Sequence, residues 1–273
     1  MRLPVPSAVL SAALLLTAAA APSFSPALAA DLSTPAAAVT VPPPMVDAAK
    51  YQLTLYGWAT ALNGHTGVRG WPAANVDISA IDALSNLDGA VMGSFMVKKS
   101  DFTFLMDVVY ANLSAGSTAG RDGASYASLG VKQAIVSGLL GYRLPVGLPQ
   151  NVDLSATVGF RYQHLSGDFQ LQTPFFGLPL STSGNQDWVD PTIGLMLNYA
   201  ITDKWFLNVI GDVGGFGLGS KITAQGFASL GYMWTPNLST AVGYRAIYTD
   251  YVNDGFVYDM TQHGVFLSAA YHF

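Results

Sequence analysis

From residue 51 to its last residue, the chain consists largely of short segments in which apolar and polar side chains alternate. A period of two is the pattern of a β-strand whose two faces meet different surroundings. Asp153 and Arg161 share one face of such a segment and Phe160 lies on the other, and mid-segment charges elsewhere fall on the small, polar face in the same way. The alternation predicts an all-β protein whose sheet has one charged and one apolar side.

We count ten such segments, which are 51–62, 86–98, 101–114, 131–143, 151–165, 188–200, 204–217, 222–234, 237–250 and 260–273. Tight turns and mostly longer, polar loops alternate between them. An even number of strands with short turns at one end and longer loops at the other is typical of an antiparallel up-and-down β-barrel that spans the outer membrane. A count of eight is the alternative, if the first two segments do not both span.

The direction of the charged face separates two kinds of barrel. A soluble barrel turns its apolar face inward, whereas a membrane barrel turns it to the lipid. The chain is 51% hydrophobic and only 11% charged, which is too apolar for the surface of a soluble protein of 273 residues. Because an Arg or Lys that faces lipid near the midplane costs roughly 2–4 kcal/mol, we expect the apolar face outside and the charges in the lumen.

Aromatic side chains on the expected outer face gather near both ends of the strands, as in the girdles that mark membrane interfaces. The girdle expected at the short-turn, periplasmic end includes Trp205, Tyr232, Trp234, Tyr271 and Phe273. Segment 260–273 runs to the last residue and needs a neighbour on each edge. We expect it to pair with 51–62 and close the barrel, since an open edge is costly in hydrocarbon.

The N-terminal residues predict the compartment. Arg2 precedes an apolar stretch, which is followed by Ala-Leu-Ala at 27–29, so residues 1–29 are interpreted as a secretory signal peptide cleaved near Ala29. A membrane anchor would need roughly 20 apolar residues. Residues 30–50 are expected to be a Pro/Ala-rich periplasmic linker and residues 51–273 the transmembrane barrel. We therefore expect an integral protein of the bacterial outer membrane, surrounded by lipid and lipopolysaccharide.

Charge and cysteine usage exclude several partners. The net charge is -5 and no Lys/Arg cluster is present, which argues against a nucleic-acid partner. No Cys is present, which excludes disulfides and thiolate metal sites. We expect a monomer without a metal ion or cofactor.

Several segments resemble known outer-membrane proteins. The C-terminal Tyr-x-Phe is similar to the terminal signature of bacterial outer-membrane barrels, which implies recognition by the barrel assembly machinery. The segments WVDPTIG, GDVGGFGLGS, GYRAIYTDY and YDMTQHG resemble recurring parts of one proteobacterial outer-membrane β-barrel family of about this length. The similarity covers most of 51–273 and implies architecture and location without an activity. Met96 departs from it, because an acidic residue is expected at that inward position.

Inward charges suggest what fills the lumen. The expected lumen charge network consists of Asp107, Arg161, Asp190, Asp212 and Arg245. A barrel of about eight strands is just filled by side chains and one of about sixteen leaves a channel, so ten strands should leave the lumen largely filled. We expect a structural network in which Arg161 bridges Asp190 or Asp212, because an unpaired buried charge costs several kcal/mol. A narrow solute pore lined by the same groups is the first alternative.

An outer-membrane hydrolase with a histidine site at the loop end is the second alternative. His65, His164 and His263 are expected at that end, but no Ser or Asp stands at a spacing that fixes a partner for His164. No catalytic residue is therefore assigned.

The pattern of residues 76–89 favours a short helix that caps the lumen, with an extension of the second strand as the alternative. The Gly-rich stretch near residue 217 fits a hairpin turn better than a phosphate loop.

Overall fold

A computed structural model of the chain describes residues 48–67, 73–119, 125–172 and 180–273. The expected signal peptide and all but the end of the expected linker lie outside the described residues. Among the described residues, no helix is long and apolar enough to cross a membrane.

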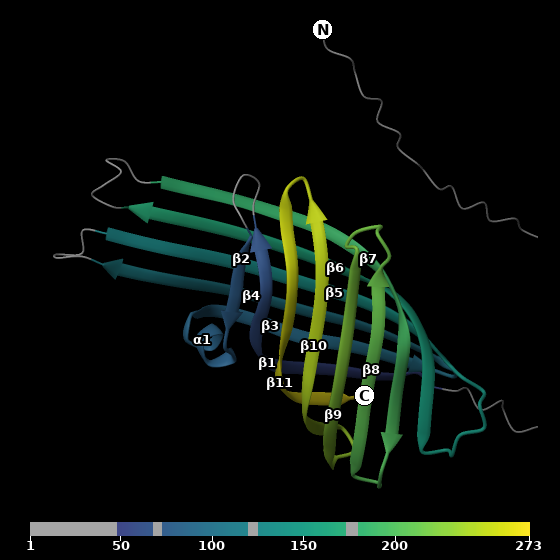
Figure 1. Ribbon diagram of the computed structural model, residues 1–273. Helices are drawn as coiled ribbons and strands as arrows, with labels where there is room; N and C mark the ends of the chain where they lie inside the picture. The colour runs from purple at the N-terminus through teal and green to yellow at the C-terminus, as the bar shows by residue number, and fades with distance from the viewer. Residues whose placement is uncertain (1–47, 68–72, 120–124, 173–179) are drawn as a thin grey trace, which may run out of the picture. The chain divides into compact units, whose positions relative to one another are not determined.

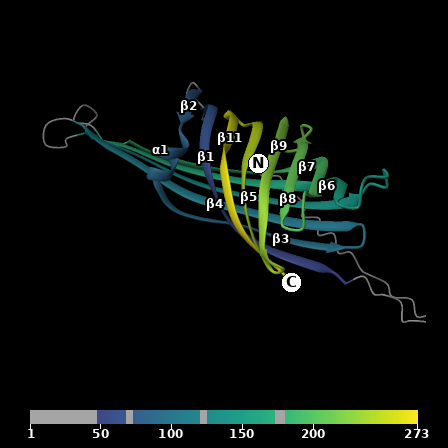
Figure 2. The same ribbon diagram turned by 90° about the horizontal axis from the view of Figure 1, so that it is seen from below.

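The described residues form eleven strands and one short helix (Figures 1 and 2). The elements are β1 (Lys50–Gly67), β2 (Ala74–Ile78), α1 (Ala80–Ser85), β3 (Leu87–Lys99), β4 (Phe102–Ala119), β5 (Ser125–Arg143), β6 (Val152–Gln172), β7 (Leu180–Ala200), β8 (Trp205–Gly215), β9 (Ile222–Thr235), β10 (Leu238–Asn253) and β11 (Phe256–His272). Neighbours in sequence pair antiparallel from β3 to β11, β1 pairs with β3, and β11 pairs with β1. The result is a closed ten-stranded barrel, with β2 as an additional strand on β1.

The predicted fold is confirmed, and the eight-strand alternative is wrong. Tyr51 exchanges both of its backbone hydrogen bonds with Phe273, at 2.9 and 3.0 Å, so the last residue closes the barrel as expected. At the short-turn end, every strand begins or ends within one residue of its expected position. At the loop end, β4 to β7 reach 18 to 21 residues and are longer than expected.

The two faces of the barrel wall differ as the alternation predicts. On the outer face, Val158 and Leu267 are 57% and 64% exposed, whereas the inward Arg161 is 1% exposed. Hydrocarbon is about 30 Å thick and a tilted strand needs about 9–11 residues to cross it. The outward positions of β7 from Val189 to Tyr199 carry only apolar or aromatic side chains, which fits this length.

The girdle residues lie on the outer face at the short-turn end, and their rings contact one another. Trp205 lies 5.0 Å from Tyr232, which lies 4.8 Å from Trp234, measured between ring centroids. Tyr271 lies 5.9 Å from Phe273. The girdle thus contains two groups of contacting rings at one end of the apolar band.

The segment between the first two spanning strands contains both a strand and a helix. Residues 74–78 form β2 on β1, and Ser79 caps α1 by accepting a hydrogen bond from the backbone N–H of Asp82. The expected helix is therefore present over residues 80–85, but it packs beside β1. β3 starts at Leu87, so the alternative of a long strand extension does not occur.

Candidate functional site

The interior of the barrel is crossed by a network of hydrogen bonds between charged and polar side chains. It is formed by Tyr56, Asp107, Arg161, Asp212, Thr223, Gln225 and Arg245, which we call the lumen network. Its members come from β1, β4, β6, β8, β9 and β10. It therefore joins strands on opposite sides of the barrel.

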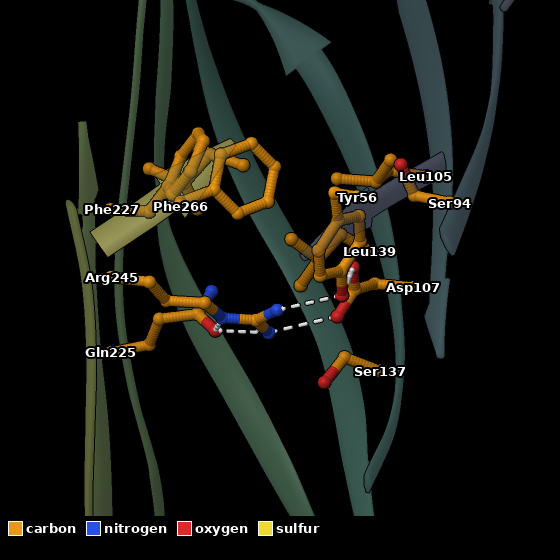
Figure 3. A pocket seen from close by; sticks show the side chains of 11 residues that line it. Tyr56, Ser94, Leu105, Asp107, Ser137, Leu139, Gln225, Phe227, Arg245 and Phe266 are labelled. Atoms are coloured by element: carbon orange, nitrogen blue, oxygen red, sulfur yellow. Dashed lines mark hydrogen bonds and ion pairs between the residues drawn. The ribbon is translucent and has the colours of Figure 1, made fainter. Parts of the chain in front are cut away.

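Arg245 holds one half of the lumen network. Figure 3 shows its side chain reaching from β10 toward Asp107 on β4, and Nη2 lies 2.8 Å from Asp107 Oδ1. Nη1 donates to the Tyr56 hydroxyl at 3.0 Å, and that hydroxyl donates to Asp107 Oδ2 at 2.7 Å. Nε and Nη2 both donate to Gln225 Oε1. The planar guanidinium thus uses all three nitrogens, which a Lys ammonium could not reproduce.

Arg161 holds the other half. Its Nη2 donates to Asp212 Oδ1 at 2.7 Å and its Nη1 to Thr223 Oγ1 at 2.9 Å. The second oxygen of Asp212 accepts a hydrogen bond from Gln225 Nε2 at 3.0 Å, which connects this pair to Arg245. The side chains of Arg161 and Asp212 are 1% and 0% exposed. Charges this deeply buried are stable only when paired and hydrogen-bonded.

Asp190 is not part of the lumen network. It stands directly opposite Arg161 in the β6–β7 register, yet no ion pair joins the two side chains. Asp190 Oδ1 instead accepts the backbone N–H of Ser220 at 2.6 Å, which fastens the turn between β8 and β9 to β7. Of the two carboxylates expected to pair with Arg161, Asp212 does so and Asp190 does not.

An aromatic cluster fills the lumen toward the loop end. Trp188 stacks on Tyr251 with ring centroids 4.2 Å apart and an interplanar angle of 12°, and Tyr258 lies 5.8 Å from Trp188. Met260 completes this buried cluster. Below it, Gln133 accepts from Gln262 at 2.6 Å. These side chains form a second layer across the interior.

A small cavity lies beside Arg245. It has a volume of about 80 Å³, and Leu105, Leu139, Phe227 and Phe266 form most of its apolar lining (Figure 3). The cavity is large enough for a few water molecules, and too small for a substrate of ordinary size, since ligand pockets measure about 300–1,000 Å³.

Toward the short-turn end of the lumen, Lys98 pairs with Asp153.

Two of the expected loop-end histidines have close partners, and both lie on the outer face. His164 Nδ1 lies 2.7 Å from Asp187 Oδ1, a partner that the sequence analysis did not identify. Asp187 comes from the adjacent strand, where spacing along the sequence cannot reveal it. His263 lies between the Tyr244 hydroxyl, at 2.5 Å, and Asn63 Oδ1, at 2.8 Å.

Among the contacts described, neither histidine has a Ser or Thr hydroxyl at hydrogen-bonding distance; their partners are Asp187, Tyr244 and Asn63. Within the described ranges, no group of three or more His or Asp residues is arranged to hold a metal ion. The two histidines stand where the apolar outer face of β6 and β11 gives way to polar residues. They therefore mark the upper boundary of the apolar band.

Three members of the lumen environment were not foreseen from the sequence. Tyr56, Gln225 and Trp58 all lie on inward positions, and the Arg245 guanidinium carbon lies 5.1 Å from the centre of the Trp58 ring. Strand alternation alone would have put Tyr56 and Trp58 on the same face as Thr54. It gives no signal that they meet Arg245, which is 189 residues from Tyr56 in sequence.

Comparisons with known proteins identify the fold. No family model matches the chain, and no curated protein is found as a relative. Among solved structures, the outer membrane protease OmpT from Escherichia coli is similar with a TM-score of 0.54 and 11% sequence identity, over 83% of this chain and 97% of OmpT. The translocator domain of autotransporter NalP from Neisseria meningitidis matches with a TM-score of 0.40 and 14% identity, over 82% of this chain and 88% of that domain.

The attachment invasion locus protein Ail of Yersinia pestis matches with a TM-score of 0.34 and 10% identity, over 82% of this chain and 98% of Ail. The similarity to OmpT shows that the fold of this chain is that of bacterial outer-membrane β-barrels. Its closed wall, apolar outer face and aromatic girdle agree with that fold. The protein is an integral β-barrel of the bacterial outer membrane.

Proposed function

We propose that this protein is a structural barrel of the outer membrane whose lumen is closed by its own side chains. The observation that carries the proposal is the lumen network, in which Arg245 and Arg161 connect opposite walls through Asp107, Gln225 and Asp212. A solute could pass only by breaking these charge-assisted bonds. Because each broken bond leaves a buried charge unpaired, passage would cost several kcal/mol.

The aromatic cluster supports the same function from the loop end. Trp188, Tyr251 and Tyr258 are each 4% or 5% exposed. A hydrated solute entering from that side would first have to displace these stacked rings. Two unlike layers in series favour a closed barrel over the alternative of a narrow passive pore.

Single-channel recording in a planar lipid bilayer tests the proposal. We expect the refolded wild-type barrel to show no steady conductance. A triple variant with Arg161→Ala, Gln225→Ala and Arg245→Ala removes the bonds that cross the lumen and is expected to conduct more than the wild type. Lys132→Ala is the control, because this Lys is exposed on the outer face and removes a charge without touching the lumen.

The alternatives predict different results. Steady wild-type conductance that changes when Arg245 alone is neutralised would support the pore. A silent barrel whose preparation hydrolyses lipid or peptide, and loses that activity with His164→Ala or His263→Ala, would support the hydrolase. Either result would overturn the structural assignment.

The proposed partners follow from the outer surface. We propose that lipid and lipopolysaccharide surround the apolar band as solvent and that the barrel assembly machinery recognises the C-terminal strand, which ends in Tyr271 and Phe273, 53% and 58% exposed on the outer face. We also propose that the barrel is a monomer, because its ten spanning strands close on themselves without a partner chain.

A further inference from the structure

Among the described strands, the ladder of paired residues along one edge of β1 is interrupted between its pairing with β3 and its pairing with β2. On one edge, β1 pairs with β11 from Gln52 to Gly67. On the other edge it pairs with β3 only up to Leu55 and with β2 only from Leu62. Residues 56–61 therefore have no strand partner on that edge, and we call this stretch the ladder break.

The backbone groups that face the ladder break can be identified. Tyr51 exchanges both backbone hydrogen bonds with Phe273 of β11. In an antiparallel pair, alternate residues turn their N–H and C=O groups to opposite edges, so Tyr56, Trp58 and Thr60 turn theirs toward the break. Thr60 Oγ1 donates to the Trp58 carbonyl at 3.0 Å, a local bond that serves one of these groups. Within the described residues, neither β2 nor β3 contributes a paired residue opposite Thr60.

The ladder break lies at the depth of the membrane. The outward positions of β1 carry Leu55, Gly57, Ala59 and Ala61 before the first polar outward residue, Asn63. Unpaired backbone groups exposed to hydrocarbon cost several kcal/mol each and do not occur as open edges there. Residues 56–61 also carry no charge and no Pro, the features that usually protect a free edge. This edge therefore needs a partner that brings hydrogen-bonding groups, which an acyl chain does not.

The helix next to the break is poorly anchored. α1 has six residues, and isolated helices of this length are unstable in water. Its two largest apolar side chains, Ile81 and Leu84, are 79% and 51% exposed, and Ala83 is its only buried residue. Its support is local: the cap from Ser79 and hydrogen bonds to the backbone oxygens of Ser79 and Asp82. Little tertiary packing would be lost if its first turn became extended.

The register of β2 leads directly into the break. β2 pairs with β1 down to Ile78 opposite Leu62. If the strand continued in the same register, Ala80 would stand opposite Thr60 and Ile81 opposite Ala59. Ala80 would then exchange hydrogen bonds with the unpaired Thr60 backbone, and Ile81 would face lipid. Residues 82–86 must connect the extension to β3, where Leu87 is fixed by pairing with Leu113. Because these five residues have a limited reach, the extension can include Ile81 but no later residue without displacing β3.

We propose that the partner of the upper part of this edge, residues 59–61, is residues 79–81 of the same chain, which exchange between the first turn of α1 and an extension of β2. In the extended form, β2 continues along β1 as far as Ile81, and residues 82–86 form the connection to β3, which runs in the same direction as β2. The ladder break then shortens from residues 56–61 to residues 56–58. The wall near the loop end thus has an open form and a more closed form. Continuity with the existing β1–β2 pairing distinguishes this partner from a foreign strand.

Disulfide trapping tests the exchange, because the chain has no Cys of its own. Ala59→Cys with Ile81→Cys places two thiols at directly opposite positions of the extended form only. This is a non-hydrogen-bonded pair, whose side chains are the closer kind. Asn63→Cys with Asp77→Cys is the positive control, since these residues already pair in β1 and β2. Gly57→Cys with Ile81→Cys is the out-of-register control. All three barrels are oxidised in outer-membrane vesicles, with folding monitored by gel mobility.

The expected result is intramolecular crosslinking of the 59/81 pair to the extent of the 63/77 pair, at a lower rate, with little crosslinking of the 57/81 pair. Adding Ser79→Ala removes the helix cap, which should lower the ratio of helical to extended form about five-fold. The rate of the 59/81 crosslink should rise by roughly the same factor. The proposal is overturned if the 59/81 pair stays reduced, if the 57/81 pair reacts equally well, or if Ser79→Ala leaves the rate unchanged. A crosslinked dimer would also overturn it and would assign the edge to a second copy.

Discussion

Replacing Arg161 tests the energetics of the lumen network. In Arg161→Met, a side chain of similar length fills the space but leaves Asp212 with Gln225 Nε2 as its remaining side-chain partner. Breaking a buried ion pair by removing one partner costs about 3–5 kcal/mol, since the other charge stays buried. For a domain of this size, that corresponds to a fall in the unfolding midpoint of roughly 6–20 °C.

The assay is the heat-induced loss of the compact band of the folded barrel on a gel, with urea unfolding in lipid vesicles as the equilibrium measurement. Arg161→Lys should recover only part of the stability, because an ammonium cannot reach both Asp212 and Thr223 as the guanidinium does. Lys132→Ala, which removes an exposed charge, should change the midpoint little.

A double-mutant cycle shows whether the loss comes from the pair. Asp212→Asn combined with Arg161→Met removes both charges, and this barrel should be more stable than Arg161→Met alone, since no carboxylate remains buried without its cation. The reasoning fails if Arg161→Met keeps the wild-type midpoint. It also fails if the losses of the two single variants simply add in the double variant.

Three further substitutions test other parts of the wall and lumen. A Cβ at Gly264 would lie 1.7 Å from the backbone oxygen of Ala59, so Gly264→Ala should lower the free energy of unfolding, measured by urea titration, by about 1–3 kcal/mol. Gly226→Ala is the control, because a Cβ there meets nothing within 4 Å. Equal stabilities of the two variants would contradict this prediction. Trp188→Ala removes a buried stacked ring and should cost about 3–5 kcal/mol by the same titration, and a loss below 1 kcal/mol would show that the aromatic cluster is loosely packed. Lys98→Ala should cost about 1 kcal/mol or less, because the Lys98 side chain is 31% exposed in its pair with Asp153, and a larger loss of the heat-resistant band would refute that reading.

The sequence predicted the parts of the fold that depend on local pattern. Alternation separated the lipid face from the lumen face and put Arg161 and Arg245 on the lumen face; both side chains are buried in the structure. Short-turn ends were also predicted, because apolar alternation stops abruptly there. The loop ends of β4 to β7 were not predicted. Residues 166–172 and 181–187 carry polar side chains on at least one face and therefore lack the apolar outer face that marks a membrane-spanning strand.

Only the tertiary structure decided which lumen residues meet. Alternation states the face of a residue, but not its depth relative to strands elsewhere in the barrel, which depends on register and strand tilt. Arg245 and Asp107 are 138 residues apart and in contact, whereas Arg161 and Asp190 are directly opposite on adjacent strands and are not paired. The ladder break has the same origin: β1 parts from β3 after Leu55 and takes β2 as its neighbour from Leu62. A period of two along one strand contains no information about where its neighbour leaves it.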